Sequence, residues 1–263
     1  MPFFDTHAHV NLEAFKDDRD DTVKRSLDAQ TWMINVGTDS ASSKIAVDMA
    51  DKYPEGVFAS VGLHPTESEI FDDSGYETGL SEKVVAVGEC GLDYFRLPEE
   101  GREAAIRKQK TEFVKQLDFA KKHGLPVIIH CRDAYPDLLE ILKKEYSGFQ
   151  GVVHSFTDSW DTARQFLDLG FYIALNGILT FDKTGRLAEV VEKVPFEKLL
   201  TETDAPYLTP PPFRGKRNEP SYVQYVAAKI AEIKKMDVEV VGEQTFENAR
   251  ALFKIKKKPT NSP

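Results

Sequence analysis

Eight short apolar runs, each followed by a stretch with helical periodicity, constrain this sequence more than any other feature. The apolar runs lie at residues 2–7, 31–38, 57–64, 83–89, 125–130, 151–156, 171–177 and 198–204. Helical patterns lie at 17–29, 42–53, 102–123, 134–145, 159–169, 185–194, 221–235 and 243–253, and a less regular one at 66–80. Strands of nearly continuous Val, Ile, Leu and Ala are typical of a parallel sheet covered by helices. Eight such units predict an α/β fold, a (β/α)8 TIM barrel.

A doubly wound open sheet is the alternative architecture for such a pattern. No GxGxxG motif follows an early strand, and no shift in composition marks a second domain. At 263 residues the chain has the length of a one-domain barrel. We therefore expect a single domain over 1–255 and a basic, frayed tail over 256–263.

Charge and cysteine content narrow the class of protein. The 43 acidic and 34 basic residues give a net charge of −9, which argues against a broad basic face for nucleic acid. No apolar run approaches the ~20 residues that span a bilayer, and no secretory signal is visible, so no membrane association is expected. Two cysteines, Cys90 and Cys131, are too few for a disulfide framework and are interpreted as small apolar filler. A cytoplasmic location is expected.

Histidines and carboxylates recur where the predicted strands end. These residues are His7, His9, His64, Glu89, His130, His154 and Asp204. In a barrel the carboxyl ends of the strands form one face, on which active sites are built. Five of the six histidines therefore converge on it, while His123 lies near a helix end before Gly124, where a role at the helix dipole suffices.

The first run, FFDTHAHVNLE, illustrates how the side chains converge. Side chains alternate across a strand, so Asp5, His7 and His9 point to the same face. Each histidine or carboxylate taken alone could be a satisfied core residue or a barrel ion pair. Four imidazoles and two carboxylates together exceed the three protein ligands typical of one catalytic zinc, and they suit two metal ions.

Several blocks of sequence resemble the TatD family of metal-dependent deoxyribonucleases, within the wider amidohydrolase-like barrels. The blocks, in order, are DTHAH, VGLHP, VGECGLDYF, GLPVIIHCRDA, HSFTDS, NGILTF, LLTETDAPYLTPPPFRGKRNEP and FENARALF, and they span nearly the whole chain. The resemblance implies a two-metal hydrolase built on a TIM barrel.

The resemblance also implies a role for each residue of the site. One metal would be held by His7, His9, Glu89 and Asp204, and the other by Glu89, His130 and His154, so that Glu89 bridges the two. Asp204 would accept the proton of the attacking water, and His64 would contact the scissile phosphate, which makes Asp204, Glu89 and His64 the catalytic set. Mixed histidine and carboxylate ligands suit Zn or Mn, while nucleases often use Mg, so the identity of the metal stays open.

Residues that could hold the substrate are less strongly indicated. Arg214, Lys216 and Arg217 follow the eighth strand and could reach phosphates, or could pin a Pro-rich loop through surface ion pairs. Arg132 is a phosphate-binding candidate or a rim ion pair. Tyr94 and Phe95 could stack on a terminal base, or could pack under the loop.

The leading functional hypothesis is a 3′–5′ exodeoxyribonuclease that uses a two-metal-activated water. The expected partner is DNA, bound at its single-stranded ends, because an end-acting enzyme needs few phosphate contacts and tolerates an acidic surface. No obligate protein partner is evident. The alternatives are an ester or amide hydrolase, such as a D-aminoacyl-tRNA deacylase, and a non-catalytic binding protein that keeps the barrel.

Overall fold

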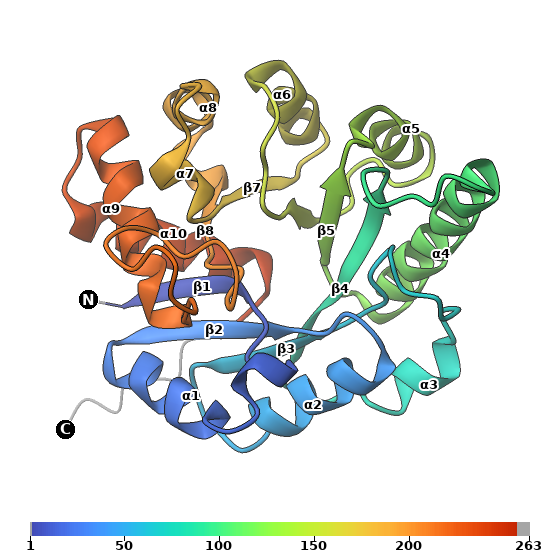
Figure 1. Ribbon diagram of the computed structural model, residues 1–263, viewed down its shortest axis with the longest axis horizontal. Helices are drawn as coiled ribbons and strands as arrows, with labels where there is room; N and C mark the ends of the chain where they lie inside the picture. Colours follow the sequence, from blue (N-terminus) through green and yellow to red (C-terminus); the bar gives the residue numbers. More distant parts are fainter. Residues whose placement is uncertain (1, 257–263) are drawn as a thin grey trace.

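A computed structural model describes residues 2–256 of the chain and contains eight parallel strands in one sheet (Figure 1). The strands are β1 (Phe3–Ala8), β2 (Thr31–Val36), β3 (Val57–Val61), β4 (Val84–Asp93), β5 (Val127–Arg132), β6 (Gly151–Val153), β7 (Tyr172–Leu175) and β8 (Leu199–Thr201). Their spatial order is the order of the sequence, and each neighbouring pair is parallel.

The sheet closes where β1 meets β8. The Thr6 hydroxyl donates to the Thr201 carbonyl oxygen at 3.1 Å, and the Thr201 hydroxyl donates to that of Phe4 at 3.1 Å. A parallel bridge between Ala8 and Ala205 continues this contact past the end of β8. The predicted TIM barrel is therefore confirmed.

The helices surround the barrel in the alternating order that the sequence predicts (Figure 1). They are α1 (Arg19–Asp28), α2 (Ser40–Ala50), α3 (Asp73–Glu77), α4 (Arg102–His123), α5 (Tyr135–Glu145), α6 (Trp160–Asp168), α7 (Ile178–Phe181), α8 (Arg186–Lys193), α9 (Val223–Lys234) and α10 (Val238–Leu252). Short 3₁₀ turns cover Glu13–Phe15, Phe196–Lys198 and Pro220–Tyr222.

The expected helix over 66–80 is wrong in extent, since only the five residues of α3 are helical. Asp72 begins this helix, because its carboxylate accepts a hydrogen bond from the Gly75 backbone N–H at 3.2 Å. An aspartate that bonds to the backbone in this way starts a helix and cannot lie within one.

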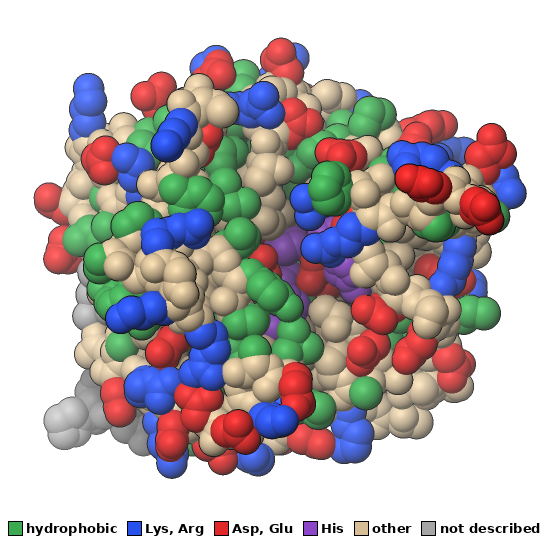
Figure 2. Space-filling view, in the orientation of Figure 1, with side chains coloured by type: hydrophobic (Ala, Val, Ile, Leu, Met, Phe, Trp, Pro, Cys, Tyr) green, Lys and Arg blue, Asp and Glu red, His purple; other side chains and the backbone are tan. Residues whose placement is uncertain are grey.

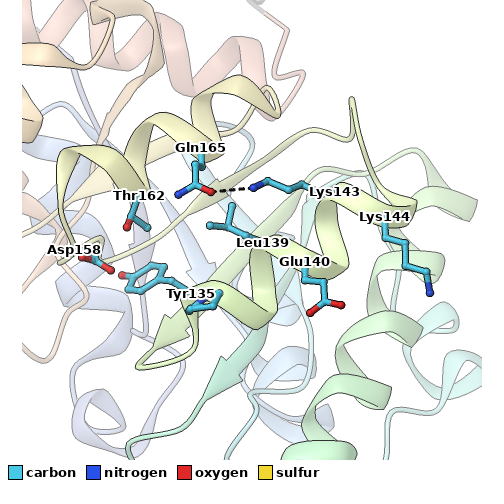
Figure 3. Close-up of a pocket in the computed structure, with 9 residues that line it drawn as sticks. Tyr135, Leu139, Glu140, Lys143, Lys144, Asp158, Thr162 and Gln165 are labelled. Atoms are coloured by element: carbon cyan, nitrogen blue, oxygen red, sulfur yellow. Dashed lines mark hydrogen bonds between the residues drawn. The ribbon is translucent and has the colours of Figure 1, made fainter.

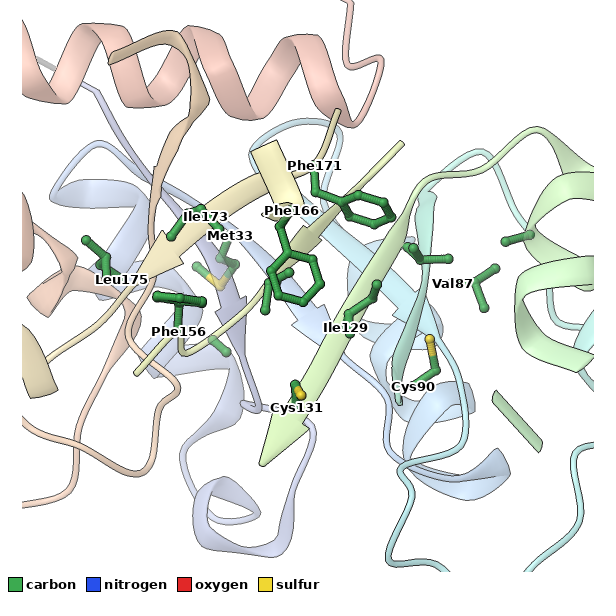
Figure 4. Packing of buried hydrophobic residues seen from close by; sticks show 14 of the residues in the cluster. Met33, Val87, Cys90, Ile129, Cys131, Phe156, Phe166, Phe171, Ile173 and Leu175 are labelled. Atoms are coloured by element: carbon green, nitrogen blue, oxygen red, sulfur yellow. The ribbon is translucent and has the colours of Figure 1, made fainter. Parts of the chain in front are cut away.

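The buried core has two parts. One cluster draws a side chain from every strand: Phe4, Ile34, Phe58, Ala86, Ile128, Val152, Ala174 and Leu200. Residues of α10, among them Phe246 and Leu252, pack against the same cluster. Because strand side chains alternate, the other cluster lies between the strands and the outer helices, and Figure 4 shows part of it around Ile129, Phe166 and Ile173.

The location of the inner cluster determines which end of the barrel interior is open to polar side chains. The inner cluster and α10 fill the end where the strands begin, so the opposite end is left for polar side chains. Cys90 and Cys131 are buried and free and belong to the outer cluster, as predicted for apolar filler.

The ends of the chain are described only in part. The expected basic tail at 256–263 lies outside the described residues except for Lys256. Across residues 2–256, none of the helices combines the length and hydropathy needed to cross a bilayer.

Candidate metal centre

All seven predicted histidines and carboxylates lie in the C-terminal halves of the strands or within three residues after them. His7 lies in β1, Glu89 in β4 and His130 in β5, while His9, His64, His154 and Asp204 follow β1, β3, β6 and β8 within three residues. Six of them line a cavity of about 770 Å³, and His7 lies fully buried beneath it. Figure 2 shows this hollow near the middle of one face, with histidine side chains at its floor.

The two histidines of the first strand converge, as the alternation of side chains predicts. Their Nε2 atoms lie 3.1 Å apart. Asp5 shares their face but does not reach the cavity. Its Oδ1 atom accepts hydrogen bonds from the backbone N–H groups of His7 at 3.2 Å and Thr203 at 2.8 Å. Asp5 therefore joins the segments that carry the histidine pair and Asp204.

Glu89 lies at the centre of the cluster, and its two carboxylate oxygens face different histidines. Oε2 lies 3.3 Å from His7 Nε2 and 3.6 Å from His9 Nε2. Oε1 lies 2.9 Å from His130 Nδ1, 2.9 Å from His154 Nε2 and 3.6 Å from His64 Nε2. The carboxylate thus separates the imidazoles into two groups, one on each oxygen.

Glycine at position 91 permits this close approach of β4 to β5. A Cβ at Gly91 would lie 2.0 Å from the His130 carbonyl oxygen, and the backbone has a φ of +144°. Any larger residue would push the two strands apart. The glycine of the ECG segment therefore keeps Glu89 within reach of His130.

Asp204 completes the group around Oε2. Its Oδ1 atom lies 3.5 Å from His9 Nε2 and 3.8 Å from His7 Nε2. The side chain is 16% exposed and lines the cavity, so it is the carboxylate of the cluster most open to an incoming molecule.

Apart from His64, whose Nδ1 lies 2.7 Å from the Thr66 hydroxyl oxygen, three of the imidazoles have a partner on the ring nitrogen that faces away from Glu89. His9 Nδ1 donates to the Val36 carbonyl oxygen at 2.9 Å, and His130 Nε2 donates to Asp93 Oδ2 at 3.1 Å. His154 Nδ1 lies 3.4 Å from Glu202 Oε1. Such outer partners orient the ring and fix which nitrogen is left for a metal.

Asp93 and Glu202 were missed by the sequence analysis, although a signal for both was present. Each lies an even number of residues from a predicted ligand on the same segment: Asp93 four after Glu89, and Glu202 two before Asp204. Alternation along β4 sends Asp93 to the same face as Glu89, whereas Glu202 and Asp204 both follow the end of β8, so only their closeness in sequence links them.

Burial and the imidazoles act in opposite directions on the pKa of Glu89. Burial alone would raise it, but His154, His64 and His7 outweigh burial and hold the pKa well below its ordinary value. Conversely, burial would lower the pKa of His154, but Glu89 and Glu202 raise it well above its ordinary value. The Glu89 carboxylate is consequently ionised, and its negative charge favours protonation of His154.

These donors fit a divalent cation. His130 Nε2 donates its proton in a hydrogen bond to Asp93, so in the neutral ring Nδ1 carries a lone pair. This lone pair faces Glu89 Oε1 at an Nδ1–Oε1 distance of 2.9 Å. The neutral His9 ring likewise turns its Nε2 lone pair toward Asp204. Lone pairs facing carboxylate oxygens repel one another unless a proton or a metal ion lies between them. Mixed imidazole and carboxylate donors are those that Zn and Mn favour.

Of the predicted substrate-binding residues, His64 and Arg132 line the cavity. Arg132 contacts an aromatic ring at its rim. The Arg132 guanidinium lies 3.8 Å from the centre of the Phe95 ring, which is 60% exposed. Tyr94 is half-buried and donates its hydroxyl hydrogen to Asp137 at 2.7 Å, so it packs beneath the loop.

The three predicted basic residues after β8 are not among the residues that line the cavity. Arg217 forms a bidentate ion pair with Asp18, with nitrogen–oxygen distances of 2.8 and 2.6 Å. Arg214 donates to the Thr209 carbonyl oxygen and lies 4.0 Å from the Phe181 ring centre. Lys216 is exposed and lies 5.8 Å from the ring centre of Phe213. These contacts favour the loop-pinning interpretation for Arg217.

A second hollow lies between α5 and α6 and has a volume of about 670 Å³ (Figure 3). Tyr135, Leu139 and Thr162 are among its lining residues, and Lys143 donates to Gln165 across it at 2.9 Å. None of the predicted site residues lines it, so the candidate metal centre belongs to the cavity at the strand ends.

Comparisons with known proteins agree on one family. The family model described as TatD related DNase matches residues 4–254. The uncharacterised metal-dependent hydrolase YabD of Bacillus subtilis is 40% identical, over 96% of this chain and 99% of its own length. The 3′-5′ ssDNA/RNA exonuclease TatD of Klebsiella pneumoniae is 34% identical, over 96% and 98% of the two chains. The crystal structure of the Escherichia coli TatD homologue YjjV superposes with a TM-score of 0.86 at 30% identity, covering 97% of this chain and 98% of the other.

Proposed function

This chain belongs to the TatD related DNase family of metal-dependent hydrolases, and from that premise we propose that it removes nucleotides from the 3′ end of single-stranded DNA. The observation that carries the proposal is the division of the imidazoles between the two oxygens of Glu89. A carboxylate that faces two separate ligand groups is suited to bridge two cations, and a two-metal site is a recurring solution to phosphodiester hydrolysis.

The histidine and carboxylate donors can be assigned to two cation positions. His7, His9 and Asp204 would join Oε2 of Glu89 at one, and His130 and His154 would join Oε1 at the other. Divalent cations there would lower the pKa of a bound water and neutralise the charge of the phosphate. We leave Mg, Mn and Zn as the candidate ions.

Asp204 is suited to accept the proton of the attacking water. Burial would raise its pKa, but its hydrogen bond with His9 and the charges of His7 and His154 hold the pKa below the ordinary value. The carboxylate is therefore ionised at neutral pH and reaches the cavity. In the proposed step the water oxygen bonds to phosphorus and one P–O ester bond breaks. Asp204 takes one proton from the water and later loses it to solvent, and the departing oxygen takes one proton from solvent.

His64 is suited to donate a hydrogen bond to the phosphate. The backbone N–H of Thr66 donates to its Nδ1 at 3.2 Å, and the Thr66 hydroxyl, which lies 2.7 Å from the same nitrogen, can donate to it as well. Both contacts are made by a neutral ring that carries its proton on Nε2, the nitrogen that faces Glu89. Burial lowers the pKa of His64 to about 3, which keeps the ring neutral at working pH. This tautomer makes His64 a donor and argues against its being a third histidine ligand at Oε1.

The proposed partner and location rest on different features. The name of the Klebsiella relative indicates action on single-stranded nucleic acid, and an end-acting enzyme tolerates a net charge of −9. We propose a cytoplasmic location because the two cysteines are free and buried, as is common in a reducing compartment.

The test is a time course on single-stranded DNA labelled at its 5′ or 3′ end, with Mg or Mn and with EDTA. We expect a metal-dependent ladder from the 5′-labelled strand, and early release of the label from the 3′-labelled strand. Asp204→Asn should abolish both, whereas His123→Gln, which alters the one histidine outside the centre, should retain them. Intact DNA in the presence of bound metal would overturn the proposal, and D-aminoacyl-tRNA would then be the next substrate to assay.

A further inference from the structure

The cavity above the metal centre has walls of different character. Of the residues between 2 and 256, Arg96, which follows β4, and Arg132, which ends β5, are the only arginines or lysines that line it. Asp39 and Glu67 line the side of β2 and β3. Ile178, Tyr207 and Leu208 line the side of β7 and β8. Since β4 and β8 are half a barrel apart, the cationic and apolar walls face each other, and Figure 2 shows basic and hydrophobic side chains on opposite sides of the hollow.

The cationic wall has unused capacity for an anion. The Arg132 guanidinium stacks on Phe95 at 3.8 Å and has no carboxylate partner among residues 2–256. Arg96 makes one ion pair, with Asp93 at 3.5 Å, and its side chain is 53% exposed. A guanidinium placed over an aromatic ring can still donate from its N–H groups to phosphate oxygens.

The apolar wall presents an aromatic ring on a fixed backbone. Tyr207 is 55% exposed, yet its N–H donates to the Asp204 carbonyl oxygen at 2.9 Å and its own carbonyl oxygen accepts from Asn218 at 2.6 Å. The neighbouring Leu208 carbonyl oxygen would lie 1.8 Å from a Cβ at position 177, so only glycine at 177 admits this loop. The ring is thus held beside the metal centre without being needed for the core.

We propose that the substrate strand crosses the cavity in one direction: its terminal nucleoside lies against Tyr207, Leu208 and Ile178, and the phosphate next to the scissile one is bound by Arg132 and Arg96. This inference rests on the proposed function and specifies its substrate as a polynucleotide with at least one phosphate beyond the scissile bond. Asp39 and Glu67 disfavour passage of the strand over β2 and β3 by charge repulsion.

The first test compares a dinucleotide, which has only the scissile phosphate, with a trinucleotide that adds one phosphate on the chain side. We expect kcat/KM of the unmodified protein to rise roughly tenfold with the added phosphate, because charge-assisted hydrogen bonds to phosphate are strong. Arg132→Ala should remove most of this rise. Arg107→Ala, which deletes an exposed arginine on α4 outside the cavity, should preserve it. A rise that is equally large in Arg132→Ala would overturn the inference.

The second test places an abasic residue at the 3′ terminus of the oligonucleotide. Loss of the base should lower kcat/KM roughly tenfold if the ring of Tyr207 stacks on it. Tyr207→Leu should show a much smaller penalty, since the stacking partner is already absent, while Tyr207→Phe, which keeps an aromatic ring, should show the same abasic penalty as the unmodified protein. Equal penalties in Tyr207→Leu and Tyr207→Phe would contradict the assignment.

Binding separates failure of this inference from failure of the proposed function. In an Asp204→Asn background with Mn²⁺, the anisotropy of fluorescein-labelled hexathymidylate should show roughly tenfold weaker binding for Arg132→Ala, and a lower salt dependence. If Arg132→Ala weakens binding in this way but the unmodified protein does not hydrolyse DNA, the nuclease proposal is rejected and the strand path is kept. Normal hydrolysis with binding that does not depend on Arg132 would reject the strand path alone.

Discussion

Glu89 is the residue on which the whole centre depends. Its two oxygens contact both groups of imidazoles, so Glu89→Gln removes the shared negative charge while conserving volume. We expect Mn²⁺ affinity to fall by more than the roughly 10- to 100-fold loss typical of outer-partner mutations, and hydrolysis to fall with it. Isothermal titration with Mn²⁺ measures the first effect.

Glu89→Asp is the matched variant for this prediction, because it keeps the charge but shortens the side chain by one methylene. It too should lose affinity, since the shorter carboxylate cannot contact both imidazole groups. Unchanged Mn²⁺ affinity in Glu89→Gln would show that the cation binds elsewhere. Circular dichroism in EDTA would confirm that both variants are folded.

Substitution of Asp93 tests whether the outer hydrogen-bond partners of the histidines contribute to metal affinity. Asp93→Asn retains an oxygen that can accept from His130 Nε2 but removes the negative charge. We expect metal affinity to fall roughly 10- to 100-fold, and Asp93→Ala to reach the upper end of that range. Titrations with Mn²⁺ that gave equal affinities for Asp93→Ala and the unmodified protein would rule out this role.

The limits of sequence reasoning at this scale have a physical origin. The seven predicted histidines and carboxylates lie in the C-terminal halves of the strands or just after them, because strand polarity determines that placement. Which side chains a loop arginine contacts depends instead on how distant segments approach. Arg217 meets Asp18, 199 positions away, and no local pattern indicates that pair.

The helices and strands predicted most accurately are those in which the apolar residues follow a single helical or strand periodicity throughout. The helix α4 spans the predicted residues 102–123 and ends, as expected, at Gly124, which has a left-handed φ of 65°. The strands β6 and β8 are only three residues long, because their predicted C-terminal residues lie in loops that carry His154 and Asp204 to the cavity. Apolar content predicts burial, but it does not distinguish a strand from the buried loop that follows it.

The ion pair that joins the loop after β8 to the segment before α1 gives a pH-dependent prediction at the element scale. Hydrogen bonds from Arg217 lower the pKa of Asp18 from 3.8 to about 2. A lowered folded-state pKa stabilises the protein above the unfolded pKa, and this stabilisation is lost as the pH falls through about 2. Asp18→Asn should therefore lower the free energy of unfolding by about 1 kcal/mol at pH 7, because Asp18 is partly exposed to solvent.

The difference between Asp18→Asn and the unmodified protein should shrink as the pH falls from 4 toward 2. Urea unfolding in EDTA at pH 7 and at about pH 3 measures it without interference from metal binding. A difference of the same size at both values would mean that the ionised pair is not its source. Asp17→Asn, at the neighbouring exposed carboxylate, provides the control.

The whole molecule is expected to respond to metal because the donors come from segments spread around the barrel. The donors lie in three strands and in three segments that follow strands: His7 in β1, Glu89 in β4, His130 in β5, His9 after β1, His154 after β6 and Asp204 after β8. A cation bound by the folded chain therefore has no equivalent site in the unfolded chain. Binding at one hundred times the dissociation constant contributes about 2.7 kcal/mol per site. For a chain of this size each kcal/mol raises Tm by about 2–4 °C.

Removal of metal should accordingly lower Tm by about 5–10 °C per occupied site, measured by calorimetry in Mn²⁺ and in EDTA. His123→Gln, which leaves the centre intact, should show the full difference, and Glu89→Gln should show little of it. The size of the shift should increase with Mn²⁺ concentration, since stabilisation by a ligand grows with its logarithm above the dissociation constant. If titration detects tight binding but Tm does not change, the ion binds the unfolded chain equally well, and the converging histidines and carboxylates at the strand ends are not the metal centre.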